Sequence, residues 1–394
     1  MSARPVIAQP QASPRAISLA LPFDPFLVIG VFGIAIASLM TLKGATAQDV
    51  PGSPNYYVLR QAMFFAIGTL AAILVSRVDY SRLREIKYAL YAGLVLAILS
   101  VYFLGADTRG SRRAIPTPIF EIQFSELGKV ILIVVVAAFL VERARYLRDG
   151  NTAWRAMILA GVPAALVISQ DLGSGIVYIA SAFAVLFVVG TPGRQLWGLF
   201  AAFATVCVLA LAVAPAAGVN VLKDYQRDRL TSFLHPSSDP ADPGYQQNQS
   251  KIAIGSGGKT GRGENATQTK LNYLPEHHTD FVFAVVGERW GFVGAGLVLS
   301  LYALLIWRGL RILTISKNLF GALIAGGIVG MLFFEVVVNV GMNVGLMPIT
   351  GIPLPMLSYG GSSVISTLLA IGLLQAIYSQ ARSATASNSR TLNF

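Results

Sequence analysis

The chain has little charge for its length. Only 12% of its 394 residues are Asp, Glu, Lys or Arg, whereas 54% are apolar. A soluble domain carries about 25% charged residues. The composition therefore excludes an ordinary soluble protein and predicts that most of the chain lies in lipid. The net charge of +11 does not indicate nucleic-acid binding, because the basic residues cluster in short loops between apolar runs.

Cysteine and histidine are nearly absent. The single cysteine, Cys207, excludes an internal disulfide and lies in an apolar run, where it is interpreted as a small packed side chain. Two of the three histidines are neighbours, His277 and His278. Two adjacent imidazoles without a third ligand are only a weak indication of a metal site. The sequence also lacks a Walker-type phosphate loop.

Long apolar runs fill the rest of the sequence. A spanning helix needs about 20 mostly apolar residues. Ten runs approach that length, at about 24–43, 57–76, 88–106, 121–141, 155–170, 175–191, 195–215, 281–307, 319–341 and 361–380. We therefore predict an all-α polytopic membrane helix bundle of about ten transmembrane helices over 23–380. A disordered cytoplasmic arm (1–22) precedes it, and a cytoplasmic tail (381–394) follows.

The basic residues predict the orientation of the bundle. Lysine and arginine favour cytoplasmic loops, and most of them lie in the short loops on the side of the N-terminus. Both termini are therefore predicted in the cytoplasm, and the polar interval 216–280 is predicted as one large extracytoplasmic loop. Arg109, Arg112 and Arg113 break the pattern on the outer side, which either chance or an anionic ligand explains.

Ionisable residues inside the spans are functional candidates, since each costs about 2.5–3.5 kcal/mol on insertion. Glu126 and Lys129 are three residues apart on one helix face and are predicted to pair, as a structural pair or as support under a polar cavity. Asp171 either caps a helix start through amides near Gly173 or lines the cavity. Glu335 has no partner nearby in the sequence, so it must pair across helices or be protonated.

The polar interval ends in Asp280, just before an apolar helix. Either Thr279 or Asp280 caps that helix, or the Asp280 carboxylate acts as a general base at the membrane surface. Apolar surroundings would raise its pKa, and the helix N-terminus would lower it. Upstream lies a Gly-rich cationic segment, read as a flexible loop that either cradles phosphate or is only a mobile surface. Its residues include Lys251, Ser256, Gly257 and Gly258.

Several longer motifs occur together. They are QFSELGK at 123–129, QDLG at 170–173, DYQRDR at 224–229, QSKIAIGSGG at 249–258, LPEHHTDF at 274–281 and GLMPITGIPLPMLSYGGSS at 345–363. With these motifs, over roughly 23–380, the chain resembles the SEDS family (shape, elongation, division and sporulation). The QSKIAIGSGG segment is more similar to the elongation members than to the division members.

The resemblance implies a peptidoglycan glycosyltransferase that polymerises lipid II at the outer face of the bacterial cytoplasmic membrane during cell elongation. It implies that Asp280 deprotonates the 4-hydroxyl of the acceptor GlcNAc. Glu126, Lys129, Asp171 and Arg60 are expected to support the cavity. The residues expected to bind substrate or pyrophosphate are Arg109, Arg112, Lys251, Ser256, Gly257, Gly258, His278, Thr279, Ser358 and Ser362.

The resemblance also implies a divalent cation, Mg²⁺ or Mn²⁺. The implied partners are a class B penicillin-binding protein, which is a transpeptidase, and other membrane proteins of the elongation complex. Three alternatives remain: a lipid II flippase, a non-catalytic scaffold of that complex, and a role in division. Ala266, Arg289 and Glu335 depart from the family pattern, and Arg289 could form a new ion pair that changes the charge beside Asp280.

Overall fold

The computed structural model describes residues 23–391, except 48, 106, 109–110, 118–120, 150, 210–228, 230–232, 234–242, 271–272 and 275. The predicted arm (1–22) and much of the first half of the predicted loop lie outside the described residues. The helices that remain determine where the candidate site is built.

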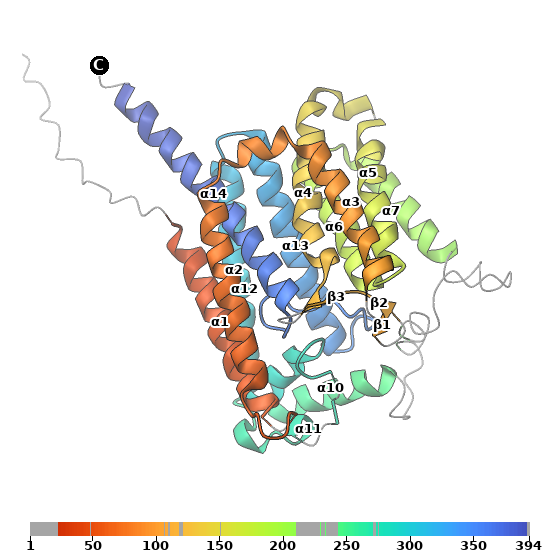
Figure 1. Ribbon diagram of the computed structural model, residues 1–394, viewed down its shortest axis with the longest axis vertical. Coiled ribbons are helices and arrows are strands. Elements are labelled where there is room, and N and C mark those ends of the chain that lie inside the picture. The colour runs from red at the N-terminus through yellow and green to blue at the C-terminus, as the bar shows by residue number, and fades with distance from the viewer. Residues whose placement is uncertain are drawn as a thin grey trace, which may run out of the picture.

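Among the described residues, ten long helices lie along the molecule, as their arrangement in Figure 1 shows. They are α1 (Pro25–Ala45), α2 (Tyr56–Ser76), α3 (Lys87–Leu104), α4 (Phe124–Glu142), α5 (Asn151–Ile168), α6 (Leu172–Val188), α7 (Gly193–Val208), α12 (Val282–Ile315), α13 (Leu319–Asn343) and α14 (Gly361–Thr391). Each predicted span overlaps one of them, and the last part of the seventh, 210–215, lies outside the described residues. Eight are long and apolar enough to cross a membrane, and α6 is a shorter apolar helix. The predicted helical membrane bundle is confirmed.

Three helices form the centre of the bundle. The buried share of the most apolar window is 72% in α4 and α13 and 89% in α14, against 22% in α2 and α3. The central α13 packs on α12, α6 and α4, while α14 packs along α2. Peripheral helices present large apolar side chains such as Phe32 and Phe103 to the outside, as a lipid-facing surface requires.

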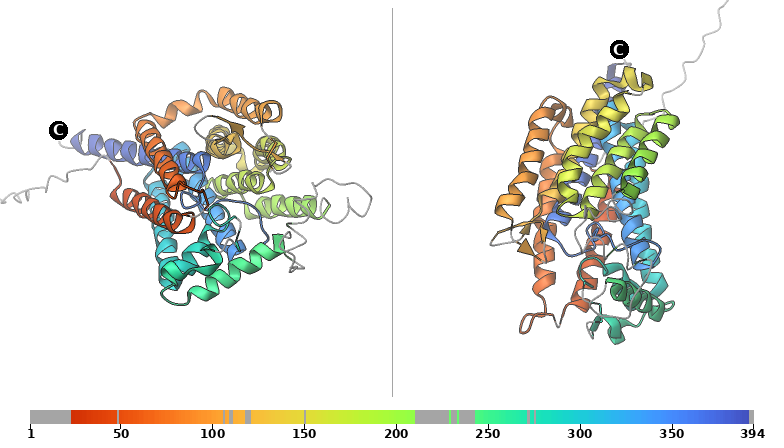
Figure 2. Two further views of the ribbon diagram at one scale, coloured as in Figure 1. Left: turned by 60° about the horizontal axis from the view of Figure 1, so that its bottom comes forward. Right: turned by 90° about the vertical axis from the view of Figure 1, so that its right-hand side faces the viewer.

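One end of the bundle carries the short elements, and we call it the α10 end. Here α10 (Pro243–Gly257), a 3₁₀ turn η4 (Gly263–Asn265) and α11 (Thr267–Lys270) cover the helix ends, with α10 lying across the bundle (Figures 1 and 2). Two short antiparallel hairpins connect α3 to α4. They are β1–β2 (Asp107–Thr108 with Ser111–Arg112) and β3–β4 (Ile115–Pro116 with Glu121–Ile122). The opposite end carries η1 (Tyr80–Arg84) and η2 (Ala144–Asp149).

Helix α12 is broken near its start, at Gly291. This glycine has φ +64°, and a Cβ there would lie 2.4 Å from the Gly261 nitrogen, so only glycine fits the break. The amides freed by it are satisfied, because Phe292 N donates to the Gly258 carbonyl at 2.9 Å and Val293 N to the Lys259 carbonyl at 3.1 Å. The segment 282–290 is therefore fastened to the loop after α10.

Two predicted boundaries move. The eighth predicted span, 281–307, lies in a helix that continues to Ile315, and its first turns belong to the α10 end rather than to the straight part of the helix. The tenth predicted span ended at residue 380, but α14 continues to Thr391 through most of the predicted tail. Apolar run length located these helices, but it could not show where polar turns continue a helix.

Candidate active site at the α10 end

The backbone around Asp280 is held by side chains from the C-terminal half of the chain. The Asp280 carbonyl accepts hydrogen bonds from the side-chain amides of Asn339, at 3.0 Å, and Asn343, at 3.1 Å. The preceding carbonyl, of Thr279, accepts one from the Ser358 hydroxyl at 2.7 Å. Both asparagines and the serine are buried. Buried amides and hydroxyls need partners, so these contacts fix the position of Asp280.

The Asp280 side chain is not used to cap α12. The N-cap residue is Phe281, which has no side-chain capping bond, and the Thr279 hydroxyl instead donates to the Glu276 carboxylate at 2.9 Å. The Ala284 amide is satisfied by the Asn343 side-chain oxygen at 3.1 Å. The prediction that Thr279 or Asp280 caps this helix is therefore wrong.

Charges of both signs surround the partly buried Asp280 carboxyl. Desolvation by the surrounding protein raises its pKa from 3.8 to about 6; Arg229 and Arg113 act to lower the pKa, while Glu276 and Asp171 raise it further. A carboxyl whose pKa lies near neutrality can be ionised at pH 7 and still accept a proton, which is the requirement for a general base.

A glycine keeps the approach to Asp280 open. A Cβ on Gly351 would lie 3.6 Å from Asp280 Oδ2 and 2.6 Å from a guanidinium nitrogen of Arg229. Its φ of +75° also favours glycine. Gly351 belongs to the long motif 345–363, and this motif therefore meets the aspartate of the 274–281 motif and the arginine of the 224–229 motif.

A buried charge triad lies deeper in the bundle. Lys129 Nζ is 2.7 Å from Glu126 Oε2 and 2.6 Å from Glu335 Oε1, and all three side chains are 3% exposed or less. Such burial is tolerated only when the charges are paired. The predicted Glu126–Lys129 pair is confirmed, and Glu335 pairs across helices, one of the two outcomes expected for it.

Asp171 connects the triad to the α6 start. Its Oδ1 accepts from the amides of Gly173, at 3.0 Å, and Ser174, so the predicted cap exists. The Ser174 hydroxyl lies 3.2 Å from Asp171 Oδ2 and 3.3 Å from Glu126 Oε1. Asp171 also acts electrostatically on Asp280, so it belongs to the charged region as well, and its predicted place in a cavity wall stays a prediction.

Arg60 lies at an aromatic cluster at the α10 end. Its guanidinium stacks over the Tyr56 ring, 4.5 Å from the centroid. The Tyr57 ring is 4.9 Å from both the His278 ring and the Tyr359 ring. The cluster joins α2 to the segment that carries Asp280. Arg60 therefore contacts the wall of the site rather than the triad.

Several predicted substrate contacts have structural partners. The Ser358 hydroxyl, besides donating to Thr279, accepts from the Leu354 amide at 2.8 Å. The Ser362 hydroxyl accepts from the Gln123 amide at 2.9 Å and donates to the Glu121 carbonyl at 3.0 Å. These hydroxyls hold together the motifs that form the site, and substrate contact by them stays a prediction.

The first part of the Gly-rich segment is helical up to Gly257 rather than a loop, and exposed turn residues follow it. Ser256 and Gly257 end helix α10, and the Ser256 hydroxyl donates to the Ala253 carbonyl at 2.9 Å. A Cβ on Gly257 would meet the Gly287 carbonyl at 1.9 Å, so this glycine permits α10 to pack on α12. The Gly258 amide donates to the Gly255 carbonyl. This packing does not support the phosphate cradle, which stays a prediction.

The remaining predicted cations divide into three cases. Lys251 is exposed, and its alkyl chain lies beside Gly345. Arg112 lies in β2, opposite Asp107 in the backbone register of the β1–β2 hairpin. Arg109 lies outside the described residues. The sequence predicted Arg113 only as a member of an Arg cluster that could meet an anionic ligand. It predicted no site role for Arg229 or Glu276, although they lie in the 224–229 and 274–281 motifs.

Metal ligands gather at one place in the described part of the chain. Asp49, His277 and His278 offer ligand atoms within 4.8 Å of one another. Asp49 lies in the loop between α1 and α2, so it supplies the third ligand that the sequence pattern lacked. Among the described residues, no group of three or more His, Cys, Asp or Glu ligands includes Asp280.

Arg289 and Glu288 find separate partners. Arg289 Nη1 donates to the Gly44 carbonyl at 2.6 Å, so the expected ion pair is replaced by a bond to backbone. The fully buried Glu288 accepts from the Gln268 and Thr269 amides at 2.8 and 3.1 Å, which caps α11.

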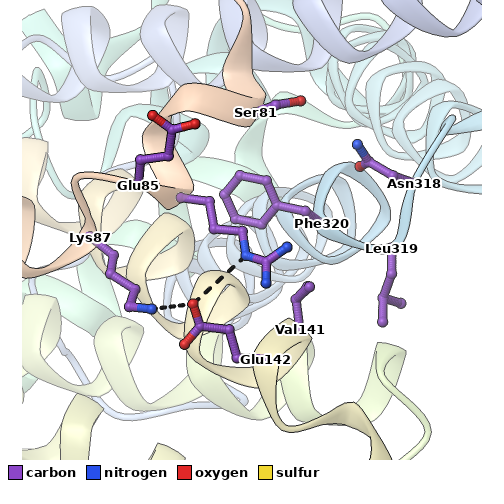
Figure 3. Close-up of a pocket in the computed structure, with 9 residues that line it drawn as sticks. Ser81, Glu85, Lys87, Val141, Glu142, Asn318, Leu319 and Phe320 are labelled. Atoms are coloured by element: carbon purple, nitrogen blue, oxygen red, sulfur yellow. Dashed lines mark hydrogen bonds and ion pairs between the residues drawn. The ribbon is translucent and has the colours of Figure 1, made fainter.

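A separate pocket lies at the other end of α13. Its volume is about 470 Å³, and it is lined by Arg84, Lys87, Glu142 and Phe320 among others. Lys87 pairs with Glu142, as Figure 3 shows, and Arg84 lies 3.8 Å from the same oxygen. Because Asp280 is bound to the C-terminal half of α13, this pocket is remote from the charged region and is not considered part of the site.

These features define a helical membrane protein with a general-base candidate held above a buried charge triad. The chain matches the "Cell cycle protein" family model of FtsW, RodA and SpoVE over residues 22–383. It is 34% identical to the peptidoglycan glycosyltransferase MrdB of Escherichia coli K12, covering 90% of this chain and 93% of that protein. It is 36% identical to a probable peptidoglycan glycosyltransferase FtsW of Geobacter metallireducens, covering 88% and 93%.

Solved structures show the same fold. One, described as "Structural coordination of polymerization and crosslinking by a peptidoglycan synthase complex", contains a chain that matches with a TM-score of 0.75 and 32% identity, covering 92% of this chain and 99% of that chain. RodA of Thermus thermophilus matches with a TM-score of 0.64 and 29% identity, covering 92% and 97%. The chain belongs to the FtsW/RodA/SpoVE family, the SEDS proteins, and is a peptidoglycan glycosyltransferase.

Proposed function

We propose that the chain polymerises lipid II during cell elongation and that Asp280 is the general base. The observation that carries this proposal is the Asp280 carboxyl, whose pKa is raised to about 6 by burial between two arginines and two further carboxylates. Its backbone is fixed by Asn339 and Asn343. A base held in place needs no reorganisation when substrate arrives.

In the proposed reaction, Asp280 removes the proton from the acceptor GlcNAc 4-hydroxyl. The oxygen attacks the anomeric carbon of the donor sugar, and the bond from that carbon to the lipid pyrophosphate breaks. The pyrophosphate departs with the bonding electron pair. Arg229 and Arg113 lie within electrostatic reach of Asp280, so they are suited to stabilise the charge that builds on the leaving group.

A divalent cation, Mg²⁺ or Mn²⁺, is part of the proposal. Mg²⁺ is commonly held by one or two carboxylates together with substrate phosphates, and Asp280 and Glu276 supply carboxylates of this kind. The described residues contain no cluster of three ligands around Asp280, which fits a cation held mainly by pyrophosphate. When bound, it would screen the charge of the leaving group.

The proposed setting is the outer face of the bacterial cytoplasmic membrane, with both termini in the cytoplasm. The proposed partner is a class B penicillin-binding protein, supported by the solved relative that belongs to a synthase complex coordinating polymerisation and crosslinking. The elongation role rests on the QSKIAIGSGG segment, since relatives named RodA, MrdB and FtsW all match at similar identity.

The test is polymerisation of purified lipid II by the purified protein with its partner transpeptidase and Mg²⁺ or Mn²⁺. Asp280→Asn should abolish polymer formation. Glu264→Gln, which changes an exposed carboxylate in η4, is the matched control and should retain wild-type activity. Circular dichroism would confirm that both variants are folded.

Other outcomes would direct the assignment elsewhere. Polymer from folded Asp280→Asn at the wild-type rate would contradict the base assignment and move attention to Asp171 or Glu126. Polymer from neither protein, with the partner still bound, would favour the flippase or the scaffold. A flippase would continue to translocate lipid II in the Asp280→Asn variant.

A further inference from the structure

His277 is held in one defined tautomer. Its Nδ1 lies 2.7 Å from the Leu274 carbonyl oxygen. A carbonyl only accepts hydrogen bonds, so Nδ1 must carry a proton. The ring is 2% exposed, so this bond fixes its orientation. Metal-binding histidines commonly donate their second ring nitrogen to a carbonyl in this way, which directs the other nitrogen at the metal.

The other nitrogen of His277 faces a carboxylate. Nε2 lies 3.1 Å from Asp49 Oδ2. With Nδ1 protonated, a neutral ring would set a lone pair against a carboxylate oxygen. The contact is favourable only if the ring is an imidazolium or if a cation lies between the two atoms. Ligands about 2.0–2.2 Å from a tetrahedral Zn²⁺ are about 3.3 Å apart, close to the separation observed here.

His278 adds a third donor to this pair. One ring nitrogen of His278, one of His277 and a carboxylate oxygen of Asp49 all lie within 4.8 Å of one another. A simple ion pair between Asp49 and His277 has no need of a second imidazole in reach. The His278 ring is also positioned by the Tyr57 ring, 4.9 Å away, and the Tyr359 ring, 6.0 Å away. The three donors are therefore held by the fold.

We propose that Asp49, His277 and His278 bind a divalent metal ion of the zinc type. Two imidazoles and one carboxylate favour Zn²⁺ and similar ions, whereas Mg²⁺ prefers oxygen ligands alone. Three protein ligands leave a fourth position for water. The site is separate from the cation proposed for the pyrophosphate, and it does not depend on the proposed function.

The metal would join two segments far apart in the sequence. Asp49 lies between α1 and α2, and the histidines lie two and three residues before Asp280. On the other side of that segment, the His278 carbonyl accepts from the Tyr359 amide at 2.8 Å, and the Thr279 carbonyl accepts from Ser358. The ion would fasten the opposite side of this segment to the loop that carries Asp49.

The test uses the purified, chelator-treated full-length protein and Co²⁺ or Zn²⁺ added alone. We expect about one ion per chain by mass spectrometry of metals after gel filtration. Co²⁺ should give the visible absorption of a four-coordinate site with nitrogen ligands. Zn²⁺ should raise the unfolding midpoint of the wild type by several degrees. Each readout is independent of polymerase activity.

Variants separate this site from the proposed catalytic one. Asp49→Asn and His277→Gln should each lose the bound ion, the Co²⁺ spectrum and the thermal shift. If only one of the two variants folds, that variant is sufficient for the test. Asp280→Asn and Glu264→Gln should retain all three. The proposal is overturned if the wild type binds no stoichiometric ion, which would leave an Asp49–His277 ion pair. It is also overturned if folded Asp49→Asn and His277→Gln bind as the wild type does.

Discussion

At the level of single residues, Asp280 combines a fixed backbone with a raised pKa. Burial raises its pKa from 3.8 to about 6, so the folded protein prefers the protonated form more than the unfolded chain does. Ionisation between about pH 4 and pH 6 therefore lowers the free energy of unfolding. The proposed general base must be ionised to accept a proton, so under that proposal the residue contributes to function at a cost in stability.

This conflict predicts opposite effects of one substitution. Asp280→Asn should remove activity but raise the free energy of unfolding at pH 7–8 by about 1–3 kcal/mol. The upper figure corresponds to the full pKa shift, and the lower figure allows for the partial exposure of the side chain. The gain should shrink to about 0.5 kcal/mol at pH 4, where Asp280 is protonated in the folded state and about half protonated in the unfolded chain. Wild-type polymerisation should fall as pH decreases through about 6.

Thermal unfolding of both proteins from pH 4 to pH 8, with polymerisation rates of the wild type over the same range, would measure these effects. A stability difference that does not depend on pH would show that the substitution acts through packing and not through the pKa.

In the charge triad, Lys129 supplies the partner that the buried Glu335 needs. Glu335, which the resemblance identifies as a departure from the family pattern, would be an isolated buried carboxylate on α13 without a partner. Lys129 lies 2.6 Å from it and shares its charge with Glu126. The Ser174 hydroxyl supplies a further contact to Glu126. The departure is therefore accommodated by a lysine already present in a paired position.

At the scale of the element, the break in α12 determines how the α10 end is built. Residues 282–290 pack against α10 and η4, and Glu288 in this segment accepts from the amides of α11, while the rest of the helix continues through the bundle. The loop 258–261 fits against the break, with Gly258 and Lys259 accepting the freed amides. The segment directly after Asp280 is thus fixed from both sides.

Gly291→Ala should disrupt this arrangement. Alanine would have to adopt a positive φ, and its methyl group would lie 2.4 Å from the backbone nitrogen of Gly261. We expect the free energy of unfolding to fall by about 2–4 kcal/mol, because this clash adds to the strain of about 1–3 kcal/mol in the backbone. Gly296→Ala lies in the same helix with open space around it and is the matched control.

Thermal unfolding and limited proteolysis of 243–270 would measure the effect of Gly291→Ala. The expected result is a lower midpoint and faster cleavage in this variant alone. Equal behaviour of the two variants would contradict the role given to the break.

At the scale of the whole molecule, the bundle has two chemically different ends. The α10 end holds Asp280, the aromatic cluster and the three metal-ligand candidates. The opposite end holds Lys87, Arg84 and Glu142 around a pocket. Basic loops favour the cytoplasm, which is the reason for placing the α10 end outside.

Single cysteines would test this orientation. In a Cys207→Ala background, Lys259→Cys in the exposed loop after α10 should react with a membrane-impermeant maleimide in intact spheroplasts. Ser383→Cys, exposed on the last turns of α14, should react only after the membrane is opened. The reverse pattern would invert the orientation and place Asp280 in the cytoplasm.

Apolar run length, an i, i+3 spacing and a motif are local properties, so they were enough to predict the helices, the Glu126–Lys129 pair and Asp280 as a candidate. Tertiary structure decided the partner of Glu335, the hold of Asn339 and Asn343 on Asp280, and the approach of Arg229. It alone brought Asp49 to His277 and His278, and it made the Gly-rich segment a packed helix end. These contacts join residues far apart in the chain, and helix packing, which local spacing does not specify, fixes their separation.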